Sequence, residues 1–242
     1  MNLFPNLTGT LSDFNKVVNE SQNKAIFTRG VEIQKEEVKA LRNYLNELEK
    51  VKSESIKRGN EKDANLILCL QFSVKAIEKE LLMLINLKED KMDEAWDCLV
   101  ESQNLIQNVI KNHPLGGEYL LGYASRLKGY EKLLFPKMMF SSAGTIIKNS
   151  ECSICNGEYS ECDHIKGTFY MGKMCQRIIK EIDELEEIST VENPDDKRCR
   201  AKAIIDRSTD GVEYETDLLT LRTKTLQPTK QNTKPSKCEP AH

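Results

Sequence analysis

The chain has 242 residues, with 35 lysines and arginines against 38 aspartates and glutamates, which gives a formal net charge of −3. This length fits one large domain or two small ones, and the 39% of hydrophobic residues is too high for a disordered chain. The near-neutral charge argues against a dedicated nucleic-acid coat, and the low aromatic content of 6% favours aliphatic helix packing over an all-β core.

The first 140 residues predict a helical region. Residues 1–30 are expected to form a loose arm with a short helix near Ser12–Asn23. Beyond them, apolar residues recur at steps of three, four and seven with charged residues between them, as in amphipathic helices. The expected helices cover residues 31–58, 62–87, 92–111 and 118–134. Short connections between long helices predict an antiparallel bundle over residues 31–140.

The composition changes after Phe140. Ser141–Gly144 has the composition of a linker, and the acidic residues 181–187 are interpreted as a solvated face. Short β-like runs are expected over residues 168–171, 175–179, 188–191, 201–205 and 217–221. We therefore expect a mainly α, α+β fold, in which the helical bundle precedes a small β-rich domain over residues 141–226. Residues 227–242 lack apolar periodicity and are expected to be a disordered tail.

A cysteine cluster lies at the start of the β-rich region. Cys152 and Cys155 are separated by two residues and followed by Asn-Gly, which is typical of a zinc knuckle because both thiolates can reach one ion. Cys162 and His164 supply two further ligands, so the four residues predict a closed, structural zinc site of three cysteines and one histidine. Cys175, beyond an expected hairpin turn at 172–173, could take the place of His164.

Catalytic readings of this segment have less support. Asp163-His164-Ile165 after a Cys-x-x-Cys pair also occurs in metal-dependent nucleases of the His-Asn-His class, where His164 would activate a water molecule. However, no asparagine lies between Ile165 and Cys175, where the middle residue of that motif would stand. The chain also has no His-Glu-x-x-His metalloprotease motif and no Gly-x-Ser-x-Gly nucleophile elbow. We therefore expect a non-enzymatic protein without catalytic residues.

Nucleic-acid binding is the main alternative function. Nine cations that surround the cysteine cluster, interleaved with Phe169 and Tyr170, could touch phosphates if they share one face. They are Lys166, Lys173, Arg177, Lys180, Lys197, Arg198, Arg200, Lys202 and Arg207. The start of the chain lacks the pattern of a signal peptide, and no apolar run reaches the length of a membrane span. We therefore expect a cytoplasmic protein that does not enter the membrane.

Residues 151–205 resemble a zinc-binding module of uncharacterised bacterial and phage proteins related to the prohead proteases of tailed phages. The resemblance rests on the Cys-x-x-Cys pair, on Cys162-x-His164-Ile165-x-Gly167, on Tyr170-x-Gly172 and on the segment Glu187–Pro194. It implies a small β-rich zinc module, but no catalytic Ser/His pair can be placed on these residues. Together with the helical region, it predicts a zinc-stabilised subunit that binds another protein, as an accessory or sensor of a phage-related or antiviral defence system.

Overall fold

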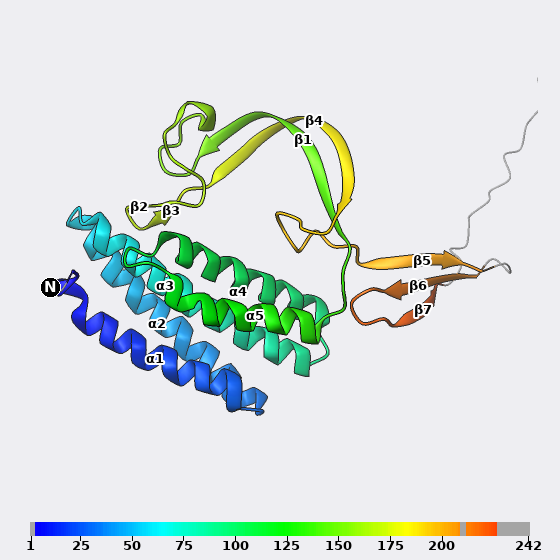
Figure 1. Cartoon of the computed structure of the whole chain (residues 1–242), viewed down its shortest axis with the longest axis horizontal. Coiled ribbons are helices and arrows are strands. Elements are labelled where there is room, and N and C mark those ends of the chain that lie inside the picture. The colour runs from blue at the N-terminus through cyan, green and yellow to red at the C-terminus, as the bar shows by residue number, and fades with distance from the viewer. Residues whose placement is uncertain (1–2, 209–211, 227–242) are drawn as a thin grey trace, which may run out of the picture. The chain divides into compact units, whose positions relative to one another are not determined.

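The structure, a computed structural model, describes residues 3–208 and 212–226 (Figure 1). The chain divides after Arg200 into two compact units, of which the first contains both the helices and the cysteine-rich segment. These two parts were expected as separate domains. The expected tail, residues 227–242, lies outside the described residues. Among the helices of the described ranges, none is both long and apolar enough to cross a membrane.

The first unit begins with a helical bundle, as the sequence predicts. Figure 1 shows its helices lying side by side. Helix α3 is the central one, since it packs against α1, α2 and α4, while α5 packs against α4. The helical elements are η1 (Pro5–Leu7), α1 (Thr8–Phe27), α2 (Val31–Lys57), α3 (Glu61–Lys88), α4 (Met92–Asn112), η2 (Glu118–Leu120) and α5 (Leu121–Leu134). The predicted mainly α, α+β fold is confirmed.

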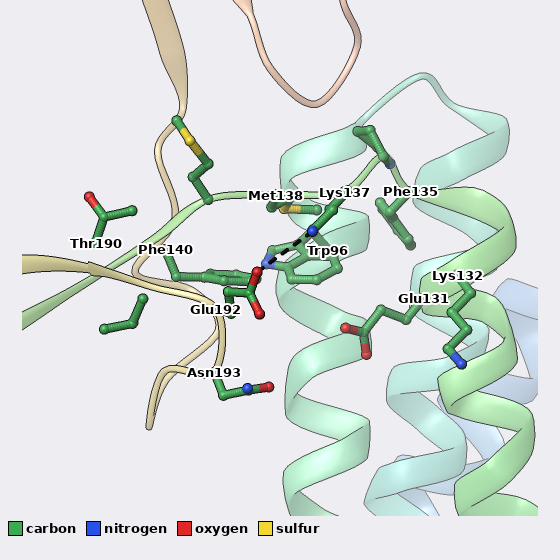
Figure 2. Close-up of a pocket in the computed structure, with 13 residues that line it drawn as sticks. Trp96, Glu131, Lys132, Phe135, Lys137, Met138, Phe140, Thr190, Glu192 and Asn193 are labelled. Carbon is green, nitrogen blue, oxygen red and sulfur yellow. Dashed lines mark ion pairs between the residues drawn. The ribbon is translucent and has the colours of Figure 1, made fainter.

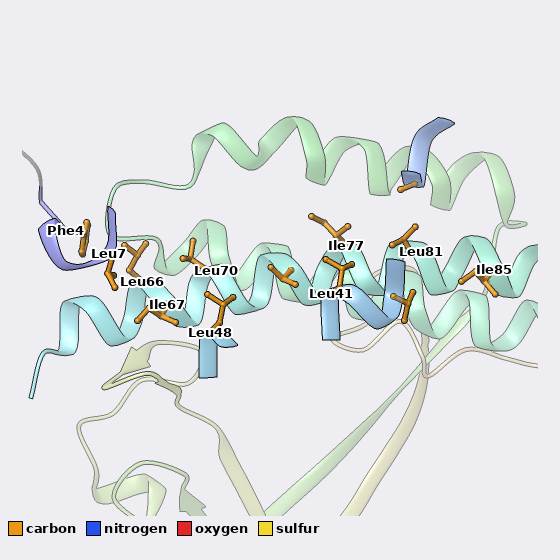
Figure 3. Close-up of a cluster of buried hydrophobic side chains, with 13 residues drawn as sticks. Phe4, Leu7, Leu41, Leu48, Leu66, Ile67, Leu70, Ile77, Leu81 and Ile85 are labelled. Carbon is orange, nitrogen blue, oxygen red and sulfur yellow. The ribbon is translucent and has the colours of Figure 1, made fainter. Parts of the chain in front are cut away.

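The N-terminal segment is more ordered than the sequence suggests. Helix α1 has 20 residues rather than the short span expected around Ser12–Asn23. Phe4 and Leu7, which precede it, are buried in the same aliphatic core as Leu41 of α2 and Leu81 of α3 (Figure 3). The apolar contacts of this segment lie on other helices, so its order depends on tertiary packing rather than on local pattern.

The turn between α2 and α3 follows directly from the sequence. Gly59 adopts a left-handed backbone, with φ of +69°, and its N–H donates to the carbonyl of Ile56 at 2.9 Å. Asn60 then caps α3, because its side chain accepts a hydrogen bond from the Asp63 N–H at 3.1 Å. A C-terminal glycine and an N-cap asparagine satisfy the exposed backbone groups of both helix ends.

A long two-stranded hairpin follows the bundle. Strand β1 (Phe140–Cys152) pairs antiparallel with β4 (Arg177–Val191). The expected linker at Ser141–Gly144 is therefore wrong, because these residues belong to β1. The acidic residues 181–187 are exposed as expected, but they lie inside a strand rather than on a helix or loop.

The hairpin register contains repeated bulges. Three residues of β4, namely Lys180, Asp183 and Glu186, have no partner in β1. Each bulge adds one residue, so residues three apart in β4 fall on the same face instead of residues two apart. One face therefore carries Ile179, Ile182, Leu185 and Ile188, and the other carries Glu181, Glu184 and Glu187.

The second unit is a small antiparallel sheet with strand order β5-β6-β7. Its strands are β5 (Ala203–Arg207), β6 (Glu213–Asp217) and β7 (Thr223–Leu226). The strand expected over residues 217–221 is wrong, because β6 ends at Asp217. The Asp217 carboxylate accepts hydrogen bonds from the N–H groups of Leu219 and Thr220, at 3.0 and 2.6 Å, and so forms a turn.

Candidate metal centre

The cysteine-rich segment connects the end of β1 to the start of β4. Cys152 is the last residue of β1, and a tight turn follows it. The Asn156 N–H donates to the Cys152 carbonyl at 2.8 Å, and Asn156 itself has a φ of +59°. The Ile154 N–H points at the Cys152 Sγ at 3.4 Å. This turn places both thiols of the Cys-x-x-Cys pair on one side of the backbone, as in a zinc knuckle.

The structure brings the four expected ligands together. One donor atom from each of Cys152, Cys155, Cys162 and His164 lies within 4.8 Å of all the others. The Nδ1 atom of His164 is buried and has no hydrogen-bond partner among the described residues. A buried polar atom without a partner requires an explanation, and coordination of an ion provides one. The cluster is therefore compatible with a metal site made of three thiolates and one imidazole.

The reserve ligand also lies beside this cluster. Cys175 is fully buried, and its Sγ is 3.8 Å from the Sγ of Cys152. Bonds of about 2.3 Å from sulfur to a tetrahedral zinc ion place two thiolates about 3.8 Å apart. Cys175 thus lies at this distance from one member of a cluster that already holds four donors, so His164 and Cys175 are both candidates for the fourth position.

Hydrogen bonding prepares Cys152 to act as a thiolate. Loss of hydration in the turn acts to raise the pKa of Cys152. Hydrogen bonds from the backbone N–H groups of Cys155 and Ile154, together with those of the Cys162 and Cys155 thiols, outweigh this effect and lower the pKa to about 6. At Cys175, desolvation and the neighbouring Cys152 thiol raise the pKa to about 11. Cys152 is therefore the more acidic thiol of this pair.

Two tyrosines, which the sequence analysis did not identify as structural residues, hold the loop around His164. The Tyr159 hydroxyl accepts a hydrogen bond from the Lys166 N–H, and the Tyr170 hydroxyl accepts one from the Ile165 N–H, both at 3.1 Å. The ring of Tyr170 also packs edge-on against the His164 imidazole, with centroids 4.7 Å apart. These contacts fix the backbone that follows the histidine and restrict the orientation of its ring.

Two asparagines join the far side of the loop to the helices. Asn112, the last residue of α4, donates to the Gly167 carbonyl at 2.8 Å and accepts from the Phe169 N–H at 3.1 Å. Asn65 of α3 donates to the Phe169 carbonyl at 3.2 Å and accepts from the Gly172 N–H at 2.7 Å. Each amide therefore satisfies two backbone groups, as a neighbouring strand would do.

An apolar contact completes this connection. Phe169 begins β2 (Phe169–Tyr170), which forms a short hairpin with β3 (Lys173–Met174). Its ring is buried and packs edge-on against Phe72 of α3, with centroids 5.3 Å apart. The turn between the two strands contains Gly172, which has a φ of +71°. A Cβ at Gly172 would lie 3.4 Å or less from atoms of Lys52 and Ala64, so a glycine allows the turn to approach the helices.

A pocket of about 600 Å³ lies elsewhere in the first unit (Figure 2). Trp96, Phe135 and Phe140 supply its aromatic wall, and Lys137 and Glu192 form an ion pair of 3.7 Å across it. The Trp96 Nε1–H already donates to the Lys197 carbonyl at 2.9 Å. None of the candidate metal ligands lines this pocket. It therefore plays no part in the metal centre.

The nine cations considered for nucleic-acid binding are only partly free of carboxylate partners. Five of them form ion pairs with carboxylates of this chain. The pairs are Lys180–Glu151, Lys197–Glu131, Arg198–Asp196, Arg200–Asp93 and Arg207–Glu213. Moreover, Lys202 and Arg207 belong to the second unit and the other seven to the first. Neither finding favours a continuous basic surface.

Comparisons with protein-family models, with curated proteins and with solved structures found no match for this chain.

Proposed function

We propose that this chain is a zinc-stabilised protein-interaction subunit. The observation that carries the proposal is the position of the metal cluster at the closed end of the hairpin. Among the described elements, no other strand and no long helix packs along the two strands of this hairpin. A metal at the closed end would fix the turn, and the exposed strands would be left free to meet a partner. The role of the ion is structural, since protein donors can fill its coordination sphere.

Zinc is the ion that these ligands fit best. Three thiolates and one imidazole, or four thiolates, make a soft donor set that suits tetrahedral zinc and disfavours magnesium or calcium. The small segment around the cluster also has few buried apolar side chains of its own, chiefly Phe169. Segments of this kind commonly require a metal to fold.

The alternative functions have less support. As a nuclease base, His164 would have to reach substrate, yet its Nδ1 is buried and one of its ring nitrogens lies within 4.8 Å of three thiols. As a nucleic-acid interface, the cysteine-rich segment would need free cations, and five of the nine are paired. A role in a phage-related or antiviral defence system rests on the resemblance of residues 151–205 alone and is proposed on that basis.

Elemental analysis of the purified chain and of a Cys152→Ala, Cys155→Ala double variant tests the metal. We expect about one zinc per wild-type chain and a loss of zinc in the variant, because two of four ligands are removed. Hydrogen exchange should then increase over residues 152–176 and not over α3. Cys69→Ala, which removes a buried thiol of α3 outside the cluster, is the matched control. A chain without zinc, or one whose loop stays protected without it, would refute the proposal.

Replacing zinc by cobalt separates the two candidates for the fourth ligand. Thiolate-to-cobalt charge-transfer absorption scales with the number of thiolates, so the spectrum distinguishes a site with three thiolates from a site with four. His164→Ala and Cys175→Ala are each compared with wild type. The variant whose spectrum matches wild type identifies the residue that does not coordinate.

A further inference from the structure

The middle of the β1–β4 hairpin exposes a continuous apolar face. Ile179, Ile182, Leu185 and Ile188 have exposed fractions of 49, 54, 55 and 70%. The register pairs them with Ser150, Ile147, Thr145 and Ala143 of β1. These four side chains and their partners Ile147, Thr145 and Ala143 form the apolar face of the hairpin, whereas Ser150 is buried. Contiguous exposed apolar surface of this kind marks an interaction site more often than a solvated surface.

The same part of the hairpin has an uncompensated negative charge. Residues 142–147 of β1 and 182–188 of β4 contain four carboxylates and no lysine or arginine. They are Asp183, Glu184, Glu186 and Glu187. In the part of the chain that the structure describes, no cation lies within ion-pair distance of any of the four. By contrast, Glu181, just outside this stretch, pairs with Lys148 at 2.7 Å.

The edge of β4 is poorly suited to receive another strand. Lys180, Asp183 and Glu186 form bulges at every third position, so the backbone groups along this edge are not regularly spaced. Bulges and charged side chains are the features that protect exposed edges from strand addition. The apolar face, rather than the edge, is therefore the surface that remains for a partner.

We propose that the apolar face of the hairpin binds a basic amphipathic segment of another protein. The apolar side of that segment would cover Ile182 and Leu185, and its lysines or arginines would lie near Asp183 and Glu186 at the bulges. This inference rests on the proposed function, since it names the partner of the same hairpin. The four carboxylates repel nucleic acid, and a second copy of this chain would bring four more carboxylates to the interface.

Fluorescence anisotropy with two synthetic helical peptides tests the inference. Both carry leucine along one face; the remaining positions are lysine in one peptide and glutamate in the other. Titrated with the zinc-loaded full chain, the lysine peptide should bind at least about tenfold more tightly than the glutamate peptide. Added salt should weaken this preference, because it screens the exposed carboxylates.

Variants assign the binding to the apolar face. Ile182→Ser with Leu185→Ser should weaken lysine-peptide binding by about tenfold or more. Ile146→Ser is the matched control, because Ile146 is 42% exposed but pairs with Glu184 on the opposite face. Asp183→Lys with Glu186→Lys changes only exposed charges, at the bulges named in the proposal, and should reverse the preference between the peptides. This charge variant still tests the inference if the Ile182→Ser, Leu185→Ser variant does not fold.

Three results would overturn the inference. The peptides could bind equally, the apolar-face variant could bind as tightly as wild type, or light scattering could detect a dimer that the apolar-face variant abolishes. The last result would identify a second copy as the occupant. Zinc content is measured on each sample, so the two proposals fail separately. A zinc-loaded chain that ignores the lysine peptide refutes only this inference, and a zinc-free chain that binds it through the apolar face refutes only the zinc-stabilised function.

Discussion

The helical bundle and the β1–β4 hairpin are stabilised in different ways. Each bundle helix buries apolar side chains against its neighbours, and α3 is covered by three other helices. In the hairpin, by contrast, no residue of β4 is buried, and the apolar residues along the middle of this strand face solvent. An isolated two-stranded hairpin is marginal in water. The stability of the hairpin therefore depends on the contacts that hold its two ends.

The two ends are held by polar contacts and a few aromatic ones rather than by a large core. At the closed end are the candidate metal ligands and the asparagine contacts to α3 and α4. At the open end, Phe140 forms a β-bridge with Arg200, and Arg200 makes an ion pair with Asp93 of α4. Removal of apolar volume should therefore damage the bundle, and removal of a few polar contacts should release the hairpin. Three substitutions sharpen this contrast.

The largest effect is expected in the bundle. Leu81→Ala removes a fully buried side chain of α3 and should lower the free energy of unfolding by about 2–5 kcal/mol. Urea unfolding followed by circular dichroism measures this loss, and the zinc content should not change. Leu133→Ala, at a position that is 83% exposed, serves as the control. Similar losses from both variants would contradict the assignment of the core to α3.

An intermediate effect is expected at the connection between loop and bundle. Asn112→Ala leaves the Gly167 carbonyl and the Phe169 N–H without their partner and should cost about 1–3 kcal/mol. The cost should appear as faster hydrogen exchange over residues 165–176, with global unfolding little changed. Asn108→Ala is the control, because the Asn108 amide donates to Asn104 of its own helix. Unchanged exchange over the loop would show that the asparagine contacts do not hold it.

The smallest effect is expected at the surface of the bundle. Hydrogen bonds from Lys91 and Lys35 lower the pKa of Glu89 to about 2. The pKa of a glutamate in the unfolded chain is about 4.3. The ionised Glu89 side chain therefore stabilises the fold fully above about pH 4.3, and this stabilisation is lost as the pH falls through about 2. Glu89→Gln should therefore be slightly less stable than wild type at neutral pH, by urea unfolding, and this difference should disappear as the pH falls through about 2. Glu36→Gln, at an exposed position, is the control and should leave the stability at neutral pH unchanged.

The candidate site could be predicted from the sequence only in part. The Cys-x-x-Cys turn is local, so spacing alone indicates that two thiols can meet. The contacts that hold the site, at Asn65 and Asn112, lie 104 and 55 residues from their partners Phe169 and Gly167. Asparagine on a helix gives no signal of such a role. The position of Cys175 could not be predicted from the sequence either, because its approach to Cys152 depends on how the β2–β3 turn folds back.

The sequence by itself determined helices α2 to α5, the α2–α3 turn and the Cys-x-x-Cys turn, because periodicity, caps and short spacing act within a few residues. Only the tertiary structure decided that residues 140–152 and 177–191 pair as strands. The ends of β4 overlap the expected β-like runs 175–179 and 188–191, but its middle gives no strand signal. There the bulges at Lys180, Asp183 and Glu186 turn the usual period of two into a period of three, and acidic residues have low β-propensity. Pairing across the intervening loop, rather than local preference, sets the conformation of this segment.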